Sequence, residues 1–288
     1  MTLSPYDIFA ALSGLLIVAV LVVVLVELPT IRRYLPAFLK YRHLLGTMVS
    51  RDFKVKYRRS VLGIFWSILQ PLFVMLIVTF VFSNVFRVAI ADYPVYYITG
   101  SFIFGLVSDS TGASLQSVIG GGSLIKKVYI PKYIFPLESC LFALISALFS
   151  FIAVIIVYIV QQYPFYPTFL LFFIPMLYAT FFSFGLGLIL SALVVYLRDI
   201  AHIWTIWLTA WFYVTPILYP LSILPDYVQS VLQFNPLVHY VDYAREIMMY
   251  GAVPGWQENL ICAGFALVTL VVGLAVFKRL QDRFVLYI

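Results

Sequence analysis

The sequence predicts an all-α membrane protein. The bundle is expected to have six core transmembrane helices, one extra N-terminal span, an amphipathic interface helix and short re-entrant outer helices. Hydrophobic residues make up 64% of the chain and charged residues only 10%, whereas soluble domains carry about 25% charged residues. Several apolar stretches reach the roughly 20 helical residues that cross a bilayer core. Of the 18 Lys and Arg, 16 fall on one predicted side, which orients the chain because basic residues stay cytoplasmic.

Three segments are expected along the chain. Residues 1–30 hold an extra apolar span at 8–26, which is expected to stay uncleaved because no positive region precedes it and no small-residue cleavage site follows. Residues 31–60 hold a cytoplasmic amphipathic helix, and residues 61–288 hold the transmembrane domain. The basic side places the N-terminus outside and the C-terminus in the cytoplasm.

Residues 37–57 show the pattern of an amphipathic helix, with basic residues on the face opposite the apolar one. The apolar positions recur at helical spacing and are Phe38, Tyr41, Leu44, Leu45, Met48, Val49 and Phe53. A helix of this kind lies in the membrane interface. Two interpretations stay open, an anchor for anionic lipids and a docking surface for a cytoplasmic partner.

The six core spans are expected to cross the membrane in alternating directions. They are residues 61–86, 95–119, 138–160, 168–197, 203–219 and 258–277. Between the last two, residues 220–256 contain four prolines and two apolar runs, 228–234 and 238–250, that are too short to cross. Irregular backbone at membrane depth must be covered by protein or water. We therefore expect two short re-entrant or interfacial helices near the outer face, with a break at Asn235-Pro236.

Asp109 lies in the middle of the second core span. An ionisable group at that depth is costly and marks a candidate functional site. The interpretations are a structural hydrogen bond to a neighbouring helix, a water-filled path and a proton relay, which Glu138 near the inner end of the next span supports poorly. The same span carries a stripe of small residues suited to close helix packing. The stripe comprises Ser101, Gly105, Ser108 and Gly112.

Two core spans carry aromatic stripes at helical spacing. The stripes are Trp66, Phe73 and Phe80 in the first span and Trp204, Trp207 and Trp211 in the fifth. Aromatic stripes in a span most often face lipid or pack helices together. Aromatic faces also stack on sugar rings, so a pathway lined in this way would let a polymer slide.

An enzyme has little support in the sequence. The glycine-rich run before Lys126-Lys127 lacks the Walker spacing, so it predicts either a flexible turn or a cytoplasmic coupling loop, and not an ATP site. The histidines lack metal-ligand spacing, the two cysteines are too few for a disulfide framework, and no Ser/His/Asp set or paired carboxylates occur. No metal or cofactor is expected in this chain, and the basic balance is a topological signal and not a sign of nucleic-acid binding.

Short motifs occur in the order typical of one family. They are residues 58–66 (RRSVLGIFW), Gln70-Pro71-Leu72, residues 81–86 (VFSNVF), residues 123–127 (SLIKK), Pro131, Phe135-Pro136, Tyr196-Leu197-Arg198-Asp199 and Phe234-Asn235-Pro236-Leu237 followed by Arg245. On these motifs the sequence resembles the type-2 permeases of ABC transporters, and more specifically the bacterial exporters of polysaccharide, O-antigen-like glycans and teichoic acid. The resemblance runs from about residue 37 to the C-terminus, and the extra span at 8–26 departs from it.

The resemblance implies a homodimer of permeases that works with two separate ATP-binding cassette ATPase subunits, which would hold ATP and Mg. The implied substrate channel residues are Trp66, Gln70, Phe73, Phe80, Asp109, Trp204, Trp207, Trp211 and Tyr213. The implied coupling residues are Arg51, Lys54, Tyr57, Arg58 and Arg59 of the interface helix, and Ser123, Leu124, Ile125, Lys126 and Lys127 of a coupling helix at 122–129. The implied exit gate comprises Phe234, Asn235, Pro236 and Arg245.

The sequence thus predicts the permease subunit of an ATP-driven exporter that moves a lipid-linked polysaccharide or teichoic acid out of the cytoplasm. Its expected location is the bacterial cytoplasmic membrane. One alternative is a type-2 permease for a drug or another small lipid-like substrate. Others are a membrane transferase acting on lipid-linked sugars, for which an acid pair is missing, and a passive channel, in which the basic helix would only be an anchor.

Overall fold

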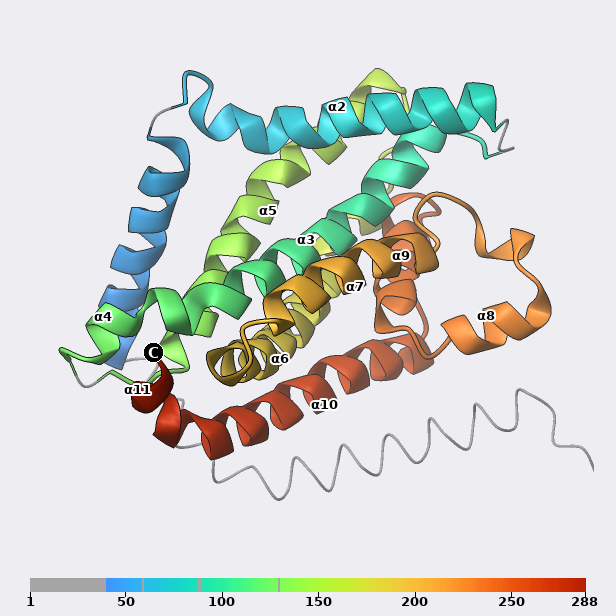
Figure 1. Ribbon diagram of the computed structural model, residues 1–288. Coiled ribbons are helices and arrows are strands. Elements are labelled where there is room, and N and C mark those ends of the chain that lie inside the picture. Colours follow the sequence, from blue (N-terminus) through green and yellow to red (C-terminus); the bar gives the residue numbers. More distant parts are fainter. Residues whose placement is uncertain (1–39, 59, 87–89, 129) are drawn as a thin grey trace, which may run out of the picture.

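The computed structural model describes residues 40–58, 60–86, 90–128 and 130–288 (Figure 1). Every regular element in these ranges is helical. The predicted N-terminal span at 8–26, the first residues of the predicted interface helix and the predicted coupling residue Arg59 lie outside the described residues.

Long helices account for most of the described chain. They are α2 (Trp66–Phe80), which continues η1 (Gly63–Phe65) and leads into the π-helical turn η2 (Val81–Val85), then α3 (Tyr93–Gly120), α5 (Ile134–Val160), α6 (Phe173–Tyr196) with η3 (Pro167–Phe172) before it, α7 (Ile200–Val214) and α10 (Trp256–Leu280). Residues 40–57 form a further helix. The short elements are α4 (Gly122–Ile125), η4 (Leu221–Ile223), α8 (Asp226–Leu232), α9 (Pro236–Met248), η5 (Gln281–Arg283) and α11 (Phe284–Tyr287).

Four helical segments of the described chain are long and apolar enough to cross a membrane. They are Gly63–Val85, Ile134–Val160, Pro167–Tyr196 and Trp256–Arg283. The chain is therefore a multi-pass membrane protein. The 28 residues of α3 make it about 42 Å long, at 1.5 Å per residue, but its sequence is more polar. The 15-residue α7 is a shorter apolar helix.

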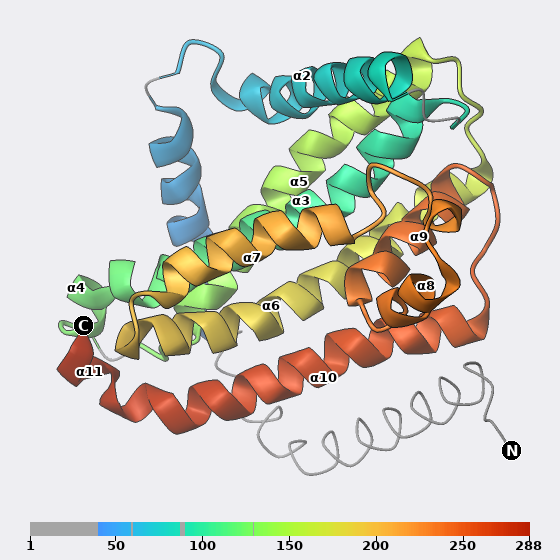
Figure 2. The ribbon, with the colours of Figure 1, turned by 45° about the vertical axis from the view of Figure 1, so that its right-hand side comes forward.

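Helix α3 is the centre of the bundle. It packs along α5 and α6, and α10 packs along the other side of α6 (Figures 1 and 2). Helices α2 and α7 contact α3 from the edges of the bundle. Of their residues only Met75 on α2 is buried, and α7 has no buried residue within the described chain. Both helices therefore leave most of their apolar surface uncovered by the described residues.

A close approach of α6 and α10 depends on two glycines. A Cβ atom on Gly185 would lie 2.4 Å from the backbone of Thr269 and Leu270, and one on Gly273 would lie 2.3 Å from the carbonyl oxygen of Gly185. Small residues let helix backbones approach closely in a membrane, where packing rather than the hydrophobic effect drives association.

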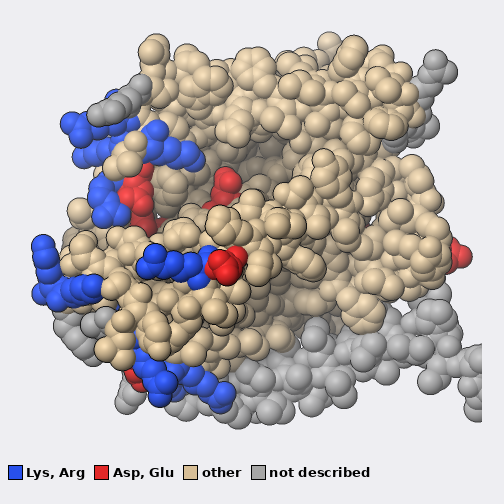
Figure 3. Space-filling view, in the orientation of Figure 1, with Lys and Arg blue, Asp and Glu red and all other residues tan. Residues whose placement is uncertain are grey.

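The helix of residues 40–57 buries one face and exposes the other. Leu45, Met48 and Val49 are buried, and Leu45 and Met48 belong to a cluster that includes Ile134 at the start of α5. The cluster also includes Phe284 of α11. The basic residues of this helix are exposed, and Lys and Arg gather at the end of the molecule that holds this helix, α4 and α11 (Figure 3). We call this end of the molecule the basic end. It corresponds to the predicted side that carries most of the Lys and Arg of the sequence.

Helix α7 is shorter than the predicted span at 203–219. It ends at Val214, and Thr215 adopts an extended conformation. The reason is Pro216, since a proline disfavours helical backbone in the residue before it and offers no N–H of its own. Residues 215–219 therefore form a non-helical segment, which we call the strap, between α7 and η4.

Candidate functional site

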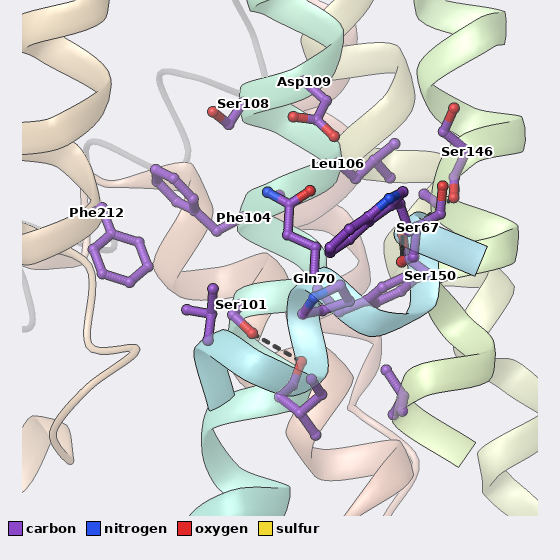
Figure 4. A pocket seen from close by; sticks show the side chains of 18 of the residues that line it. Ser67, Gln70, Ser101, Phe104, Leu106, Ser108, Asp109, Ser146, Ser150 and Phe212 are labelled. Carbon is purple, nitrogen blue, oxygen red and sulfur yellow. Dashed lines mark hydrogen bonds between the residues drawn. The ribbon is translucent and has the colours of Figure 1, made fainter. Parts of the chain in front are cut away.

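A cavity of about 530 Å³ lies between α2, α3, α5 and α7 (Figure 4). The molecular surface is hollowed between α2 and α7 (Figure 3). The residues that line the cavity come from five parts of the chain. They include Lys56 and Tyr57 before α2, Trp66, Ser67 and Gln70 of α2, Ser101, Phe104, Gly105, Ser108 and Asp109 of α3, Ser146 and Ser150 of α5, and Leu208, Thr209, Phe212 and Tyr213 of α7.

Three of the four residues of the small-residue stripe on α3 face this cavity, and its two glycines do not pack against a neighbouring helix of the described chain. Ser101, Gly105 and Ser108 line the cavity. A Cβ atom on Gly105 or on Gly112 would meet nothing within 4 Å. The stripe therefore widens the cavity in this chain, which differs from the close packing that the sequence pattern indicates.

Asp109 points into the cavity beside Ser108 (Figure 4). Within the described chain its carboxylate forms no hydrogen bond or ion pair. A structural hydrogen bond to a neighbouring helix, the first interpretation of this residue, is thus absent from the described residues. No other acidic residue lines the cavity there, so the described lining offers no second carboxylate for a proton relay.

Of the seven predicted aromatic channel residues, two line the cavity and five do not. Trp66 and Tyr213 lie on its wall. Phe73 and Phe80 are 53% and 65% exposed and lie on α2 away from the cavity lining. The sequence reasoning missed Phe104 and Phe212, whose rings meet edge to face at 5.2 Å.

The tryptophan stripe of α7 lies beside the cavity and outside its lining. The Trp204 indole donates to the Thr111 hydroxyl at 3.3 Å, and the Trp211 indole donates to the Asn235 side chain at 2.8 Å. Trp207 is 53% exposed, and its ring centre is 6.1 Å from that of Trp211. Two of the three rings therefore fasten α7 to other elements.

Asn235, a predicted exit-gate residue, connects three elements. Its side-chain oxygen accepts hydrogen bonds from the Trp211 indole and from the Leu237 N–H, which caps α9. Its side-chain nitrogen donates to the Thr215 hydroxyl at 3.1 Å. Pro236 is the first residue of α9, a position where its missing N–H costs nothing. Phe234 is half exposed.

Arg245 lies on α9, is only 3% exposed and is hydrogen-bonded to the strap. Its guanidinium donates to the carbonyl oxygens of Pro216 at 2.8 Å and of Ile217 at 3.4 Å. The hydroxyl of Tyr93 on α3 donates to the carbonyl of Leu218 at 2.9 Å. The tyrosines of α3 were missed by the sequence reasoning, although three of them fall within five residues at the start of the helix.

At the basic end, the predicted coupling residues divide into two groups. On α4 and just after it, Ser123, Lys126 and Lys127 are exposed, whereas Leu124 and Ile125 pack on the hydrophobic cluster of that end. Lys126 donates to the carbonyl of Ile288 at 2.6 Å, so the C-terminal segment lies against α4. The label C in Figure 1 lies beside both α4 and α11.

The helix of residues 40–57 reaches the cavity through Tyr57. The hydroxyls of Tyr57 and Ser67 are hydrogen-bonded, and both residues line the cavity. Arg51 pairs with the adjacent Asp52 at 2.8 Å, and Lys54 and Arg58 are exposed. Within the part of the chain that the structure describes, no group of His, Cys, Asp and Glu could hold a metal ion.

These features define a polytopic helical membrane protein with an internal polar and aromatic cavity, which is the architecture of a transport subunit. Residues 43–249 match the family of ABC-2 type transporters, and the chain belongs to that family. It is 34% identical to the O-antigen export system permease protein RfbA of Klebsiella pneumoniae over 245 residues, which cover 84% of this chain and 93% of the relative. It is 29% identical to RfbA of Myxococcus xanthus over 251 residues, 85% and 95% of the two chains.

A more distant relative is named for an acidic glycan. The polysialic acid transport protein KpsM of Escherichia coli is 25% identical over 239 residues, which cover 81% of this chain and 91% of KpsM. Each of these relatives aligns with this chain over nearly its whole length. The resemblance seen in the sequence motifs is thereby confirmed at the level of the family.

Proposed function

We propose that the chain is the membrane-spanning permease subunit of an ATP-driven exporter of polysaccharide. The observation that carries this proposal is the cavity, whose wall combines aromatic rings with hydroxyl and amide groups in a chain similar to O-antigen export permeases. Aromatic faces suit the apolar faces of sugar rings, and hydroxyl and amide groups suit their hydroxyls. A drug or another lipid-like substrate would use the rings but would leave most of the polar groups unpaired.

The proposed topology adds α3 and α7 to the four apolar spans, which gives six core spans. The basic end is assigned to the cytoplasm because Lys and Arg are retained there. The helix of residues 40–57 then lies in the inner interface with its basic face toward the cytoplasm, and α8 and α9 form the outer re-entrant helices. The extra span at residues 8–26 stays a prediction.

We assign the uncovered faces of α2 and α7 to the contact between two copies of the chain. These helices flank the cavity and carry exposed apolar side chains, among them Phe73, Ile77 and Ile206. Isologous contacts between identical surfaces close a two-fold dimer. In such a dimer the two cavities would face each other and form one pathway, with exit past the straps and the residues of the predicted gate.

ATP hydrolysis is assigned to two separate ATPase subunits that bind the basic end. Closure of these subunits would move α4 and the helix of residues 40–57 together with the spans. The hydrogen bond between Tyr57 and Ser67 offers a direct link from that helix to α2 and to the cavity. Such a motion is a rigid-body switch that nucleotide biases between two states.

The test begins with the tagged chain extracted in mild detergent and assayed for a copurified ATPase. We expect an ATPase partner whose activity depends on this chain. The same chain should restore surface glycan to cells that lack their own exporter. A Walker-lysine variant of the ATPase is the matched control. Purification of the chain without an ATPase, even after cross-linking in membranes, together with no surface glycan, would contradict the proposal.

A further inference from the structure

We propose that Asp109 is a specificity-determining residue of the pathway, whose carboxylate binds sugar hydroxyls and excludes glycans that carry carboxylates. The inference rests on the proposed function, because it assigns a substrate class to the same cavity. It predicts preferential export of glycans built from neutral sugars. The placement of Asp109, the groups around it and the chemistry of its ligand each contribute to the argument.

The first step is the free hydrogen-bonding capacity of Asp109. The side chain points into the cavity (Figure 4), and within the described chain it has no hydrogen-bond partner. Charged groups within spans are rare and usually mark substrate or ion pathways. A carboxylate offers acceptor sites only, about four for its two oxygens, so an unpartnered one requires donors from outside the protein.

The second step is that Asp109 shares this space with other polar side chains that lack hydrogen bonds within the described chain. Gln70 of α2 and Ser108 of α3 point into the same cavity (Figure 4), and the side chains of both lack hydrogen bonds to the described residues. By contrast, the hydroxyl of Ser101 donates to the carbonyl of Ile98 at 3.2 Å. Gln70, Ser108 and Asp109 thus form a set with one amide, one hydroxyl and one carboxylate, which we call the polar triplet.

The third step is the distribution of charge around the triplet. Lys56 is the one basic residue of the described cavity lining. Its ammonium group lies 5.5 Å from the ring centre of Tyr57 and 5.4 Å from that of Phe142, and it forms no ion pair with Asp109. The carboxylate is therefore not neutralised by direct pairing.

The fourth step is the chemistry of the ligand. Neighbouring hydroxyls of a sugar ring can donate two hydrogen bonds to one carboxylate, and hydrogen bonds to charged groups are the strong ones. The amide of Gln70 and the hydroxyl of Ser108 can accept or donate to the next hydroxyls. A glycan that carries its own carboxylate would bring a like charge against Asp109, and such juxtaposition suppresses the wrong partner.

The experiment compares two glycans that share the same lipid carrier and the same terminal sugars and differ only in a carboxylated sugar within the repeat. Cells without their own exporter receive this chain and its ATPase, and surface glycan is measured per molecule of inserted permease. We expect the wild type to favour the neutral glycan by about tenfold or more, the value of one charge-assisted interaction. D109N should abolish most of that preference, because it keeps the size of the side chain and removes the charge.

D109S is the second variant, which shortens the side chain as well as neutralising it, and it should also lower export of the neutral glycan. The matched control is D226N, which removes a carboxylate from an exposed position on α8, outside the cavity lining. An unchanged ratio of neutral to acidic export in both D109N and D109S would overturn the inference while the proposed function stands. Export of neither glycan by the wild type, beside a working reference exporter, would instead overturn the proposed function.

Discussion

The guanidinium carbon of Arg245 lies 3.6 Å from the ring centre of Tyr96. The guanidinium donates to the carbonyls of Pro216 and Ile217, and the Tyr96 hydroxyl donates to those of Pro216 and Tyr219. One stacked pair from α9 and α3 thus satisfies carbonyls of the strap, which lack helical partners because the strap is not helical. A cation over an aromatic face adds about 2 kcal/mol where water is excluded.

Arg245→Met is expected to lower the free energy of unfolding by about 1–3 kcal/mol, because buried strap carbonyls lose their donors. Export should fall as well, since the strap joins α7 to the helices beyond it. The measurement is thermal unfolding in detergent beside the export assay. Tyr96→Phe serves as control, because it keeps the ring and loses only hydroxyl bonds, at a cost of about 1 kcal/mol. Equal stability of Arg245→Met and the wild type would refute the assigned role.

Asn235→Ala is expected to destabilise the protein by about 1–2 kcal/mol, because the side chain caps α9 and also bonds to Trp211 and Thr215. Asn235→Asp should be milder, since it keeps both acceptor contacts and loses only the donor to Thr215. Thermal unfolding of the two variants is the measurement. The cap assignment fails if the alanine variant is no less stable than the aspartate variant.

Local periodicity was enough to predict a helix at residues 37–57 and its apolar face, and the described part of this segment, residues 40–57, is helical. Leu45, Met48 and Val49 recur at the spacing of one helical face, and the structure buries all three. The end of α7 was harder to place, although Pro216 is visible in the sequence. Residues 215–219 are apolar enough to continue a span, but Pro216 ends the helix, and contacts from Tyr96 and Arg245 hold the strap as a separate element.

The cavity could not be assembled from the sequence, because its wall joins positions far apart in the chain. The sequence marks Asp109 and Trp66 as candidates, because they are a charged and an aromatic residue within spans. It does not mark Leu208, Thr209 and Phe212. These three residues face the cavity because Trp204 and Trp211 turn the adjacent face of α7 toward Thr111 and Asn235. The direction of a helix face is set by such tertiary contacts.

Trp207→Ala and Trp211→Phe are expected to separate stability from transport. Trp211→Phe removes an indole donor from Asn235 and should lower stability by about 1 kcal/mol. Trp207 is more than half exposed, so Trp207→Ala should leave thermal unfolding of the isolated chain almost unchanged. If Trp207→Ala alone changes export or dimerisation, the Trp207 ring serves transport or the contact between two copies, and not the stability of the fold. Large destabilisation by Trp207→Ala would contradict its exposed position.

Gly185→Ala is expected to be one of the most damaging small substitutions. Its Cβ atom would lie 2.4 Å from the backbone of α10, so the two helices would have to separate, at a cost of about 1–3 kcal/mol. Gly112→Ala is the matched control on α3, where a Cβ atom meets nothing within 4 Å and helix propensity favours alanine by about 1 kcal/mol. Thermal unfolding of both variants tests this, and equal shifts would contradict the close packing.

His239 on α9, which is too short to cross the membrane, is expected to make stability depend on pH. Burial lowers its pKa, but the hydrogen bonds to the Glu258 carboxylate at 3.3 Å and to the Gln233 carbonyl at 2.7 Å outweigh burial and raise the pKa above the usual 6.5. Because the folded pKa is the higher one, this stabilisation is fully present below about pH 6.5 and is lost as the pH rises through the folded pKa.

The size of this effect is expected to stay below about 1 kcal/mol, because the Glu258 side chain is 44% exposed and solvent screens the pair. His239→Gln keeps a donor for the Gln233 carbonyl and removes the titration. Thermal unfolding between about pH 5.5 and 8.5 spans the titration range of a histidine with a raised pKa. A wild-type slope that persists in His239→Gln would show that another group titrates.

Lys127→Glu is expected to uncouple ATP hydrolysis from export. Lys127 is exposed just after α4 at the basic end, whereas the neighbouring Lys126 bonds to Ile288 within the same chain. Reversal of an exposed charge at a docking surface should weaken contact with the ATPase and lower export about tenfold, while inserted protein stays at the wild-type level. Lys126→Gln is the comparison, because it disturbs the C-terminal segment without reversing a charge. The ATPase rate and the amount of surface glycan are measured on the same cells. If the ratio of surface glycan to ATPase rate is unchanged in Lys127→Glu, α4 is not part of the coupling surface.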